Sequence, residues 1–173
     1  IKYLYMKPKN CLIFGGSGQI GSFLIRKLTK NNLKVTVVTR NAHQKGLKIK
    51  TQGNAGYIDV KEANIFDEKK IEKLFGEADY CINLIGILYE KKKGNTFKNI
   101  HSIFPTILSK LCKKYNLKQF IHVSALGIND AIDSKYAISK LEGENNVLDN
   151  FSKTTILRPS VVFSNSDNFS TQF

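Results

Sequence analysis

The stretch that decides the fold is Asn10-Cys11-Leu12-Ile13-Phe14-Gly15-Gly16-Ser17-Gly18-Gln19-Ile20-Gly21. Its first five residues are mostly apolar, and four glycines follow within seven residues. Beyond the glycines, apolar side chains recur at helical spacing: Ile20, Phe23, Leu24 and Leu28. The stretch therefore predicts a strand, a tight turn and a helix in immediate succession.

The glycines of this turn form two overlapping fingerprints, G-x-x-G-x-x-G from Gly15 and G-x-G-x-x-G from Gly16. Glycines at this spacing allow a tight turn, a close approach of the backbone to a pyrophosphate, and close packing of the helix on the strand. The N–H groups and the dipole at the start of the helix favour an anion there. We therefore predict a dinucleotide site. The alternative is a glycine-rich turn kept only for flexibility.

Short apolar runs alternate with helical patterns along the rest of the chain. They predict strands near residues 35–40, 57–62, 80–85, 119–124 and 154–157, and helices near 68–75, 99–115 and 135–148. The polar stretch 41–56 holds three glycines and is expected to be a loop. Strands and helices that alternate over short connections form βαβ units. The predicted fold is therefore α/β, with one doubly wound, mostly parallel sheet in a single domain spanning residues 1–173.

Composition limits the function classes. The 42% share of hydrophobic residues is typical of a packed globular protein, and no apolar run reaches the roughly 18 residues of a membrane span, so we expect a cytoplasmic protein. Three cysteines without C-x-x-C spacing predict free thiols and no metal. The net charge of +13 comes from scattered lysines and only three arginines. This argues against nucleic acid as a partner and leaves a solvated basic surface or a docking surface.

The second predicted strand ends at Thr39-Arg40, with no Asp or Glu nearby. A carboxylate at this place holds the adenosine ribose of NAD, whereas an arginine suits a 2′-phosphate. The sequence therefore predicts NADP(H) as the preferred cofactor, with NAD(H) still able to bind. The alternative is an arginine stacked on the adenine ring, which discriminates little.

A candidate catalytic group follows from Tyr136 and Lys140, which lie one helical turn apart and share a helix face. A nearby ammonium stabilises a phenolate, so a lysine can activate a tyrosine. Ser124 ends the fifth predicted strand, at the sheet edge where ligands of open α/β sheets bind. The purely structural alternative is a cap, a packed aromatic ring and a solvated charge.

In chain order, Gly15-x-x-Gly18-x-x-Gly21, Ser124 and Tyr136-x-x-x-Lys140 resemble the extended or atypical short-chain dehydrogenase/reductase superfamily, of the epimerase/dehydratase type. More narrowly, residues 83–88, 120–127, 134–144 and 157–160 resemble the NAD(P)H-binding accessory subunit of respiratory complex I and its bacterial relatives. This second resemblance implies a structural or regulatory nucleotide.

The resemblance also implies roles for individual residues. The pyrophosphate would lie against Gly15, Ser17, Gly18, Gln19 and Ile20, the 2′-phosphate against Arg40, and the adenosine side against Asn64, Ile65, Leu84, Ile85 and Gly86. Pro159 would lie near the nicotinamide. In an active member Tyr136 transfers the proton, Lys140 lowers its pKa and holds the nicotinamide ribose, and Ser124 orients the substrate oxygen.

Three departures from the superfamily affect the expected function. Asn64 stands where Asp is usual, and His101 stands where extended members often carry the Asn of a proton relay. The chain stops at Phe173, whereas the family continues into a substrate-binding lobe, so we expect a truncated chain with that lobe missing and little catalysis.

Two main interpretations remain open at this point. The first is an NADP(H)-binding accessory subunit that contacts complex I subunits or a membrane surface, at the inner face of a respiratory membrane. The second is an NADP-dependent oxidoreductase, epimerase or dehydratase with a Ser-Tyr-Lys site. A redox-sensing regulator with the same fold is a third. Superfamily members often dimerise through the helices near 99–115 and 135–148, so a dimer is also expected to be accessible.

Overall fold

The computed structural model describes residues 8–91 and 94–162. Its strands form one sheet in which every neighbouring pair is parallel. The sheet has the order β3-β2-β1-β4-β5-β6. The chain therefore switches direction between β1 and β4, and this is the order of the doubly wound Rossmann fold. The six strands are β1 Asn10–Phe14, β2 Lys34–Thr39, β3 Ile58–Glu62, β4 Tyr80–Asn83, β5 Gln119–Val123 and β6 Thr154–Leu157.

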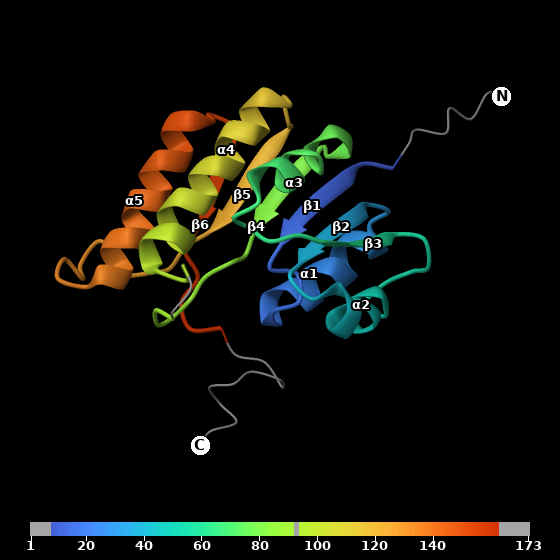
Figure 1. Cartoon of the computed structure of the whole chain (residues 1–173), viewed down its shortest axis with the longest axis horizontal. Coiled ribbons are helices and arrows are strands. Elements are labelled where there is room, and N and C mark those ends of the chain that lie inside the picture. Colours follow the sequence, from blue (N-terminus) through green and yellow to red (C-terminus); the bar gives the residue numbers. More distant parts are fainter. Residues whose placement is uncertain (1–7, 92–93, 163–173) are drawn as a thin grey trace, which may run out of the picture.

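Helices cover both faces of the sheet (Figure 1). On one face lie α1 (Gln19–Lys30) and α2 (Ala42–Lys50). On the other lie α3 (Glu68–Glu72), the short 3-10 helix η1 (Phe75–Glu77), α4 (Phe104–Lys114) and α5 (Lys135–Asn150). A π-helical turn, η2 (Lys98–Ile103), leads into α4. In the described residues, no helix combines the length and the apolar character needed to cross a bilayer.

Each face of the sheet has its own hydrophobic core because side chains alternate along a strand. On β1, Leu12 and Phe14 point toward α3 and α4, where Phe14 packs edge-to-face on Phe104 with ring centroids 5.4 Å apart. Cys11 and Ile13 point the other way, toward Ile25 of α1 and Ile49 of α2. β1 is thus buried on both faces and holds the glycine turn in a fixed place.

The expectation of a loop over residues 41–56 is wrong, because α2 occupies Ala42–Lys50. Gly46 does not break this helix, since it lies on the buried side, where an added Cβ would meet Val60 of β3 at 3.9 Å. The start of the helix is capped from a distant strand, where the Glu62 carboxylate accepts from the Ala42 N–H at 2.7 Å. The space beside Gly46 and the cap at Ala42 both depend on β3, which is distant in sequence. The pattern of the polar stretch alone therefore does not predict the helix.

The three thiols, Cys11, Cys81 and Cys112, are buried within the cores. Burial raises the pKa of Cys11 to about 11 and that of Cys81 well above its ordinary value. Within the described residues, no three His, Cys, Asp or Glu side chains are grouped so as to hold a metal ion.

Candidate functional site

The glycine turn lies at the carboxyl end of β1, directly before α1. Gly15 has a φ of +83°, and a Cβ there would lie 3.0 Å from the carbonyl carbon of Leu84. A Cβ on Gly21 would lie 2.5 Å from the Cα of Gly16. The turn, the first residues of α1 and the chain after β4 therefore approach one another too closely for side chains at these two positions.

The start of α1 is electropositive. Gly18 is the N-cap and supplies no side-chain hydrogen bond, and no acidic residue lies in the first turn. The first N–H groups of a helix lack partners within the helix, and the helix dipole adds partial positive charge there. The arrangement suits a phosphate group.

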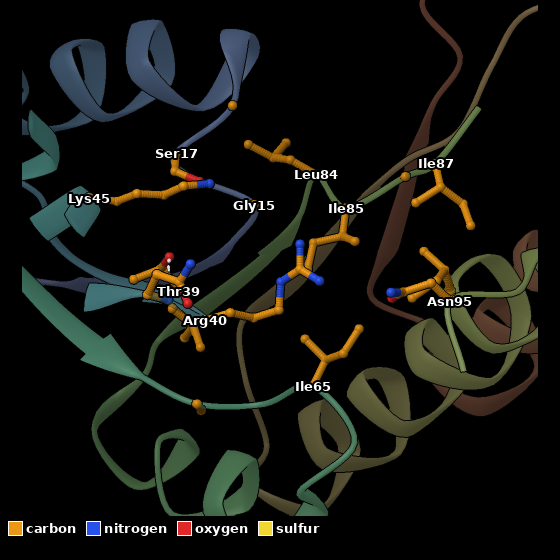
Figure 2. A pocket seen from close by; sticks show the side chains of 16 residues that line it. Gly15, Ser17, Thr39, Arg40, Lys45, Ile65, Leu84, Ile85, Ile87 and Asn95 are labelled. Atoms are coloured by element: carbon orange, nitrogen blue, oxygen red, sulfur yellow. Dashed lines mark hydrogen bonds between the residues drawn. The ribbon is translucent and has the colours of Figure 1, made fainter. Parts of the chain in front are cut away.

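A cleft of about 560 Å³ opens beside the turn, at the carboxyl ends of β1, β2 and β4. Figure 2 shows the Arg40 guanidinium extending into this cleft and the Lys45 side chain reaching toward Ser17. The cleft brings together residues predicted for the pyrophosphate, the 2′-phosphate and the adenosine side: Gly15, Ser17, Gly18, Arg40, Ile65, Leu84, Ile85 and Gly86. We call it the adenosine half.

Two residues depart from the expected lining of this half. Lys45 lines it but was missed, because the helix that carries it was read as a loop. Asn64 is not among the lining residues. Its side-chain oxygen instead accepts from the Phe66 N–H at 3.1 Å, within the turn before α3. The predicted adenine contact of Asn64 stays a prediction without support from this geometry.

A second cavity of about 390 Å³ shares Gly15, Gly18, Leu84 and Gly86 with the first, and we call it the nicotinamide half. It is lined by the other predicted site residues: Gln19, Ile20, Ser124, Tyr136, Lys140 and Pro159. The two cavities thus flank the glycine turn, one on each side of the point where the strand order reverses.

Tyr136 and Lys140 project from α5, whose start is capped by the Ser134 hydroxyl accepting from the Ala137 N–H at 3.3 Å. The Lys140 side chain is buried, and its Nζ donates to the Val123 carbonyl at 3.3 Å. Burial lowers the pKa of Lys140 to about 8, partly offset by the Glu144 carboxylate.

The expected lowering of the Tyr136 pKa is not seen in this arrangement, where burial raises it instead. The Lys140 Nζ lies 6.0 Å from the centroid of the Tyr136 ring and its hydrogen bond goes to a backbone carbonyl. The tyrosine and lysine share one cavity, and the role of the lysine in activating the tyrosine stays a prediction.

A buried polar pair lies beneath this half. The Asn83 side-chain amide donates to Nδ1 of His122 at 3.1 Å, and its oxygen accepts from the Ile85 N–H at 3.1 Å. Nδ1 therefore acts as an acceptor, so the proton of the neutral ring is on Nε2, which is buried without a partner in the described structure, as is the Ser124 hydroxyl. Burial and the charge on Lys140 lower the pKa of His122 to about 3.

His101 connects three segments around the same half. Its Nε2 accepts from the Ile87 N–H at 3.0 Å, so its proton is on Nδ1, which lies 3.0 Å from the Ser139 hydroxyl. The ring packs edge-to-face on Tyr136, with centroids 5.2 Å apart. Burial, reinforced by Lys140, lowers the pKa of His101 to about 3. A neutral imidazole thus ties the chain after β4 to α5 at the position where extended members carry Asn.

An ion pair fixes the end of β6 to α5. The buried Glu144 carboxylate accepts from Nε of Arg158 at 2.9 Å and 3.1 Å and also from its Nη2. Arg158 directly precedes Pro159, so this pair sets where the chain enters the nicotinamide half. Sequence reasoning named neither partner's role, because a single Glu and a single Arg on separate elements carry no local signal.

The sheet order, the glycine turn at its switch point and the cleft across that turn define a dinucleotide-binding protein of the Rossmann type. Within that class, residues 11–173 match the NAD dependent epimerase/dehydratase family, and the chain belongs to this family.

Two curated relatives bear out the narrower resemblance. The NADH-ubiquinone oxidoreductase 40 kDa subunit, mitochondrial, of Neurospora crassa is 28% identical over 155 residues, which is 90% of this chain and 41% of the relative. The NADH dehydrogenase [ubiquinone] 1 alpha subcomplex subunit 9, mitochondrial, of Dictyostelium discoideum is 28% identical over 158 residues, covering 91% and 43% of the two chains. The chain spans about two fifths of the length of these relatives.

Solved structures agree on the fold. A putative NAD-dependent epimerase/dehydratase from Bacillus halodurans has a TM-score of 0.76 at 19% identity, covering 92% of this chain and 74% of that one. UDP-glucuronic acid 4-epimerase from Bacillus cereus, in complex with NAD, has a TM-score of 0.74 at 23% identity. The match covers 89% of this chain and 57% of the epimerase. The predicted doubly wound α/β fold is thereby confirmed.

Proposed function

We propose that this chain is the nucleotide-binding part of an accessory subunit of respiratory complex I, and that it holds NADP(H) in a structural or regulatory role. The relatives from Neurospora crassa and Dictyostelium discoideum are named as complex I subunits, which supports this assignment. The chain would then contact other complex I subunits and lie at the periphery of the respiratory membrane.

The observation that carries the choice of NADP(H) is the pair of cations in the adenosine half. Arg40 follows β2 directly, at the place where a ribose-binding carboxylate would stand, and Lys45 lines the same cleft from α2. A charge-assisted hydrogen bond contributes about 1.5 to 3 kcal/mol, or roughly ten- to a hundredfold in affinity. The 2′-phosphate of NADP(H) offers such a bond, whereas the hydroxyl of NAD(H) does not.

The arrangement of α5 supports a retained rather than a consumed cofactor. Burial raises the pKa of Tyr136, and the ammonium of Lys140 donates to a backbone carbonyl. A tyrosine whose pKa lies above its ordinary value of about 10 is a poor base at neutral pH. We therefore expect cofactor to bind without appreciable turnover.

The second candidate function is an NADP-dependent oxidoreductase, epimerase or dehydratase. One observation favours it: Ser124, Tyr136 and Lys140 line a single cavity beside the glycine turn. In this reading Tyr136 exchanges a proton with the substrate, Ser124 orients the reacting oxygen, and Lys140 holds the nicotinamide ribose.

Calorimetric titration of the purified chain with NADPH and with NADH tests the cofactor assignment. We expect NADPH to bind roughly ten- to a hundredfold more tightly than NADH, and the preference to collapse in Arg40→Ala. Arg26→Ala is the matched control, because Arg26 is an exposed arginine on α1 whose Nη2 bonds to Gln52 outside the cleft. Equal affinities in the wild type would contradict the phosphate-clamp role of Arg40.

Consumption of NADPH with carbonyl substrates, and interconversion of nucleotide sugars, separate the two candidate functions. The accessory-subunit proposal expects rates no higher than those of Tyr136→Phe. Turnover that falls by two orders of magnitude or more in Tyr136→Phe, while NADPH affinity is unchanged, would support the enzyme instead.

The predicted dimer surface also remains to be tested. α4 and α5 pack against each other, and large apolar side chains are exposed on α5, at Ile138 and Leu148, and at Ile103 of the adjoining η2. Analytical ultracentrifugation of the wild type and of Ile138→Lys distinguishes a dimer through these helices from a monomer.

A further inference from the structure

Charge is distributed unevenly along the chain. The first 58 residues contain 11 lysines and arginines and no aspartate or glutamate, whereas residues 59–173 contain 16 basic and 14 acidic residues. Nearly all of the net charge of +13 therefore originates in the part of the chain that forms β1, α1, β2 and α2.

The fold places five of these eleven cations on the outward side of two neighbouring helices. α1 and α2 cover the same face of the sheet (Figure 1), and Ile25 and Ile49 anchor them in one core. Arg26 on α1 donates to Gln52, just after α2, at 2.7 Å, so the two helices lie side by side. We define the basic face as the outward side of these helices, with the exposed residues Phe23, Arg26, Lys27, Lys30, Leu47, Lys48 and Lys50.

Two large apolar side chains stand out from the basic face. Phe23 is 54% exposed and Leu47 is 78% exposed. Phe23 shares a helical stripe with Lys27 and Lys30, opposite the buried Ile25, and the Arg26 guanidinium lies 5.8 Å from its ring centroid. On α2, Leu47 stands directly beside Lys48. Each apolar side chain is thus bordered by cations.

We propose that the basic face docks on an anionic lipid surface. Lysines around isolated apolar side chains are typical of surfaces that lie at a membrane interface, where the cations meet headgroup charge and the apolar side chains enter the acyl boundary. Protein interfaces, in contrast, are enriched in arginine, tyrosine and tryptophan and depleted in lysine. The basic face has four lysines, one arginine and neither tyrosine nor tryptophan.

The basic face is separate from the cleft. None of its residues lines either half, whereas Lys45, which does line the adenosine half, is left out of it. The inference deepens the proposed membrane-peripheral location and rests on that location for its setting. Its physical basis is independent of cofactor binding. An experiment can therefore contradict lipid binding without contradicting NADP(H) binding, and the reverse.

Vesicle flotation with the purified chain tests the proposal. The probes are vesicles of phosphatidylcholine alone and of phosphatidylcholine with 30% phosphatidylserine, in low salt and in high salt. We expect binding to the anionic vesicles only, and its loss in high salt. A lysine near an anionic membrane contributes about fivefold in affinity, so Lys27→Glu, Lys30→Glu and Lys48→Glu together should weaken binding by at least about 100-fold.

The matched control places the same charge change on the opposite layer, as Lys69→Glu, Lys110→Glu and Lys113→Glu on α3 and α4, all exposed. We expect this variant to keep most of its vesicle binding. A Phe23→Ser, Leu47→Ser variant should bind anionic vesicles more weakly at every salt concentration. Circular dichroism confirms folding of each variant, and NADPH titration shows whether the cofactor site is intact.

Three results would overturn the lipid assignment: no binding to the anionic vesicles, equal losses in the two lysine variants, or binding of an acidic protein through this face without binding of vesicles. Vesicle binding that persists while NADPH fails to bind would instead contradict the proposed function and leave the basic face supported.

Discussion

The two halves of the cleft are built by different means. The adenosine half is shaped by backbone that approaches too closely for a side chain at Gly15, and by the exposed cations Arg40 and Lys45. The nicotinamide half is shaped by buried polar side chains, chiefly His101, His122 and Lys140, each with a pKa displaced by burial. The adenosine half should therefore bind its ligand with little cost to the stability of the fold. The nicotinamide half should lower that stability, because it buries groups that would otherwise be charged.

Acid should reveal this difference most strongly. His101 and His122 have folded pKa values of about 3 against an ordinary value of 6.5, so below pH 6.5 the unfolded chain binds more protons than the folded one. These two histidines therefore cost no stability well above pH 6.5, and the free energy of unfolding falls as the pH drops from 6.5 toward 3. At pH 5 each histidine should lower the free energy of unfolding by about 2 kcal/mol, giving about 4 kcal/mol together. Urea unfolding at pH 5 and pH 8 measures this loss in the free energy of unfolding.

The exposed His43 provides the control for this loss. His43→Gln should leave the difference between pH 5 and pH 8 unchanged, whereas His122→Gln should reduce it by about 2 kcal/mol. A difference between the two pH values that does not respond to His101 or His122 substitution would show that other groups dominate the acid response.

Gly21→Ala tests the glycine turn, which lies between the two halves. The new Cβ would meet the Gly16 backbone at 2.5 Å, so the turn or the start of α1 must shift. Forcing a methyl into a packed site typically destabilises a protein by about 1 to 3 kcal/mol. We expect a loss at the upper end, and at least about a tenfold weaker affinity for NADPH, measured by thermal unfolding and calorimetry. Gly76→Ala, where an added Cβ meets nothing within 4 Å, should change neither quantity appreciably.

The contrast between the halves also explains what the sequence could predict. The adenosine half is contiguous in sequence, because the strand, the glycine turn, the helix and Arg40 follow one another within about 30 residues and each has a local signature. Short helical patterns likewise predicted α1, α4 and α5. The fold was therefore predictable, as was most of the lining of this half.

The nicotinamide half depends on contacts between distant residues. The Asn83 contact with His122 spans 39 positions and that of His101 with Ser139 spans 38. The Lys140 hydrogen bond runs from α5 to the Val123 carbonyl at the end of β5. No local pattern records such contacts, so the Asn83 contact with His122 was not predicted, whereas Ser124, Tyr136 and Lys140 were predicted as site residues. Lys45 was missed for a related reason, since α2 is held by the packing of Ile49 in the core and by the Glu62 carboxylate of β3.

Lys140→Met should stabilise the protein, the opposite of the usual effect of a core substitution. The folded pKa of about 8 lies below the ordinary 10.5, so the charged lysine is disfavoured in the folded state at neutral pH, and wild-type stability rises with pH between 8 and 10.5. Replacing it with a side chain of similar length should add up to about 3 kcal/mol to the free energy of unfolding at pH 7, fading above pH 8. Thermal unfolding of the wild type and of Lys140→Met at pH 7 and pH 10 measures the gain in stability and its disappearance at high pH. A destabilised variant at pH 7 would show that the Val123 hydrogen bond outweighs the burial of charge.

Arg40→Ala should leave stability nearly unchanged, and this smallest effect sharpens the comparison most. Arg40 is exposed, and surface substitutions away from special features usually change stability by less than about 0.5 kcal/mol. The same substitution should remove most of the preference for NADPH, so at Arg40 function and stability separate. Urea unfolding of Arg40→Ala beside Lys140→Met, each with and without saturating NADPH, tests both statements. Because a ligand stabilises the folded state according to its affinity, the wild type should gain more from NADPH than Arg40→Ala does. Equal gains in the two proteins would mean that the guanidinium in the adenosine half does not contact the cofactor.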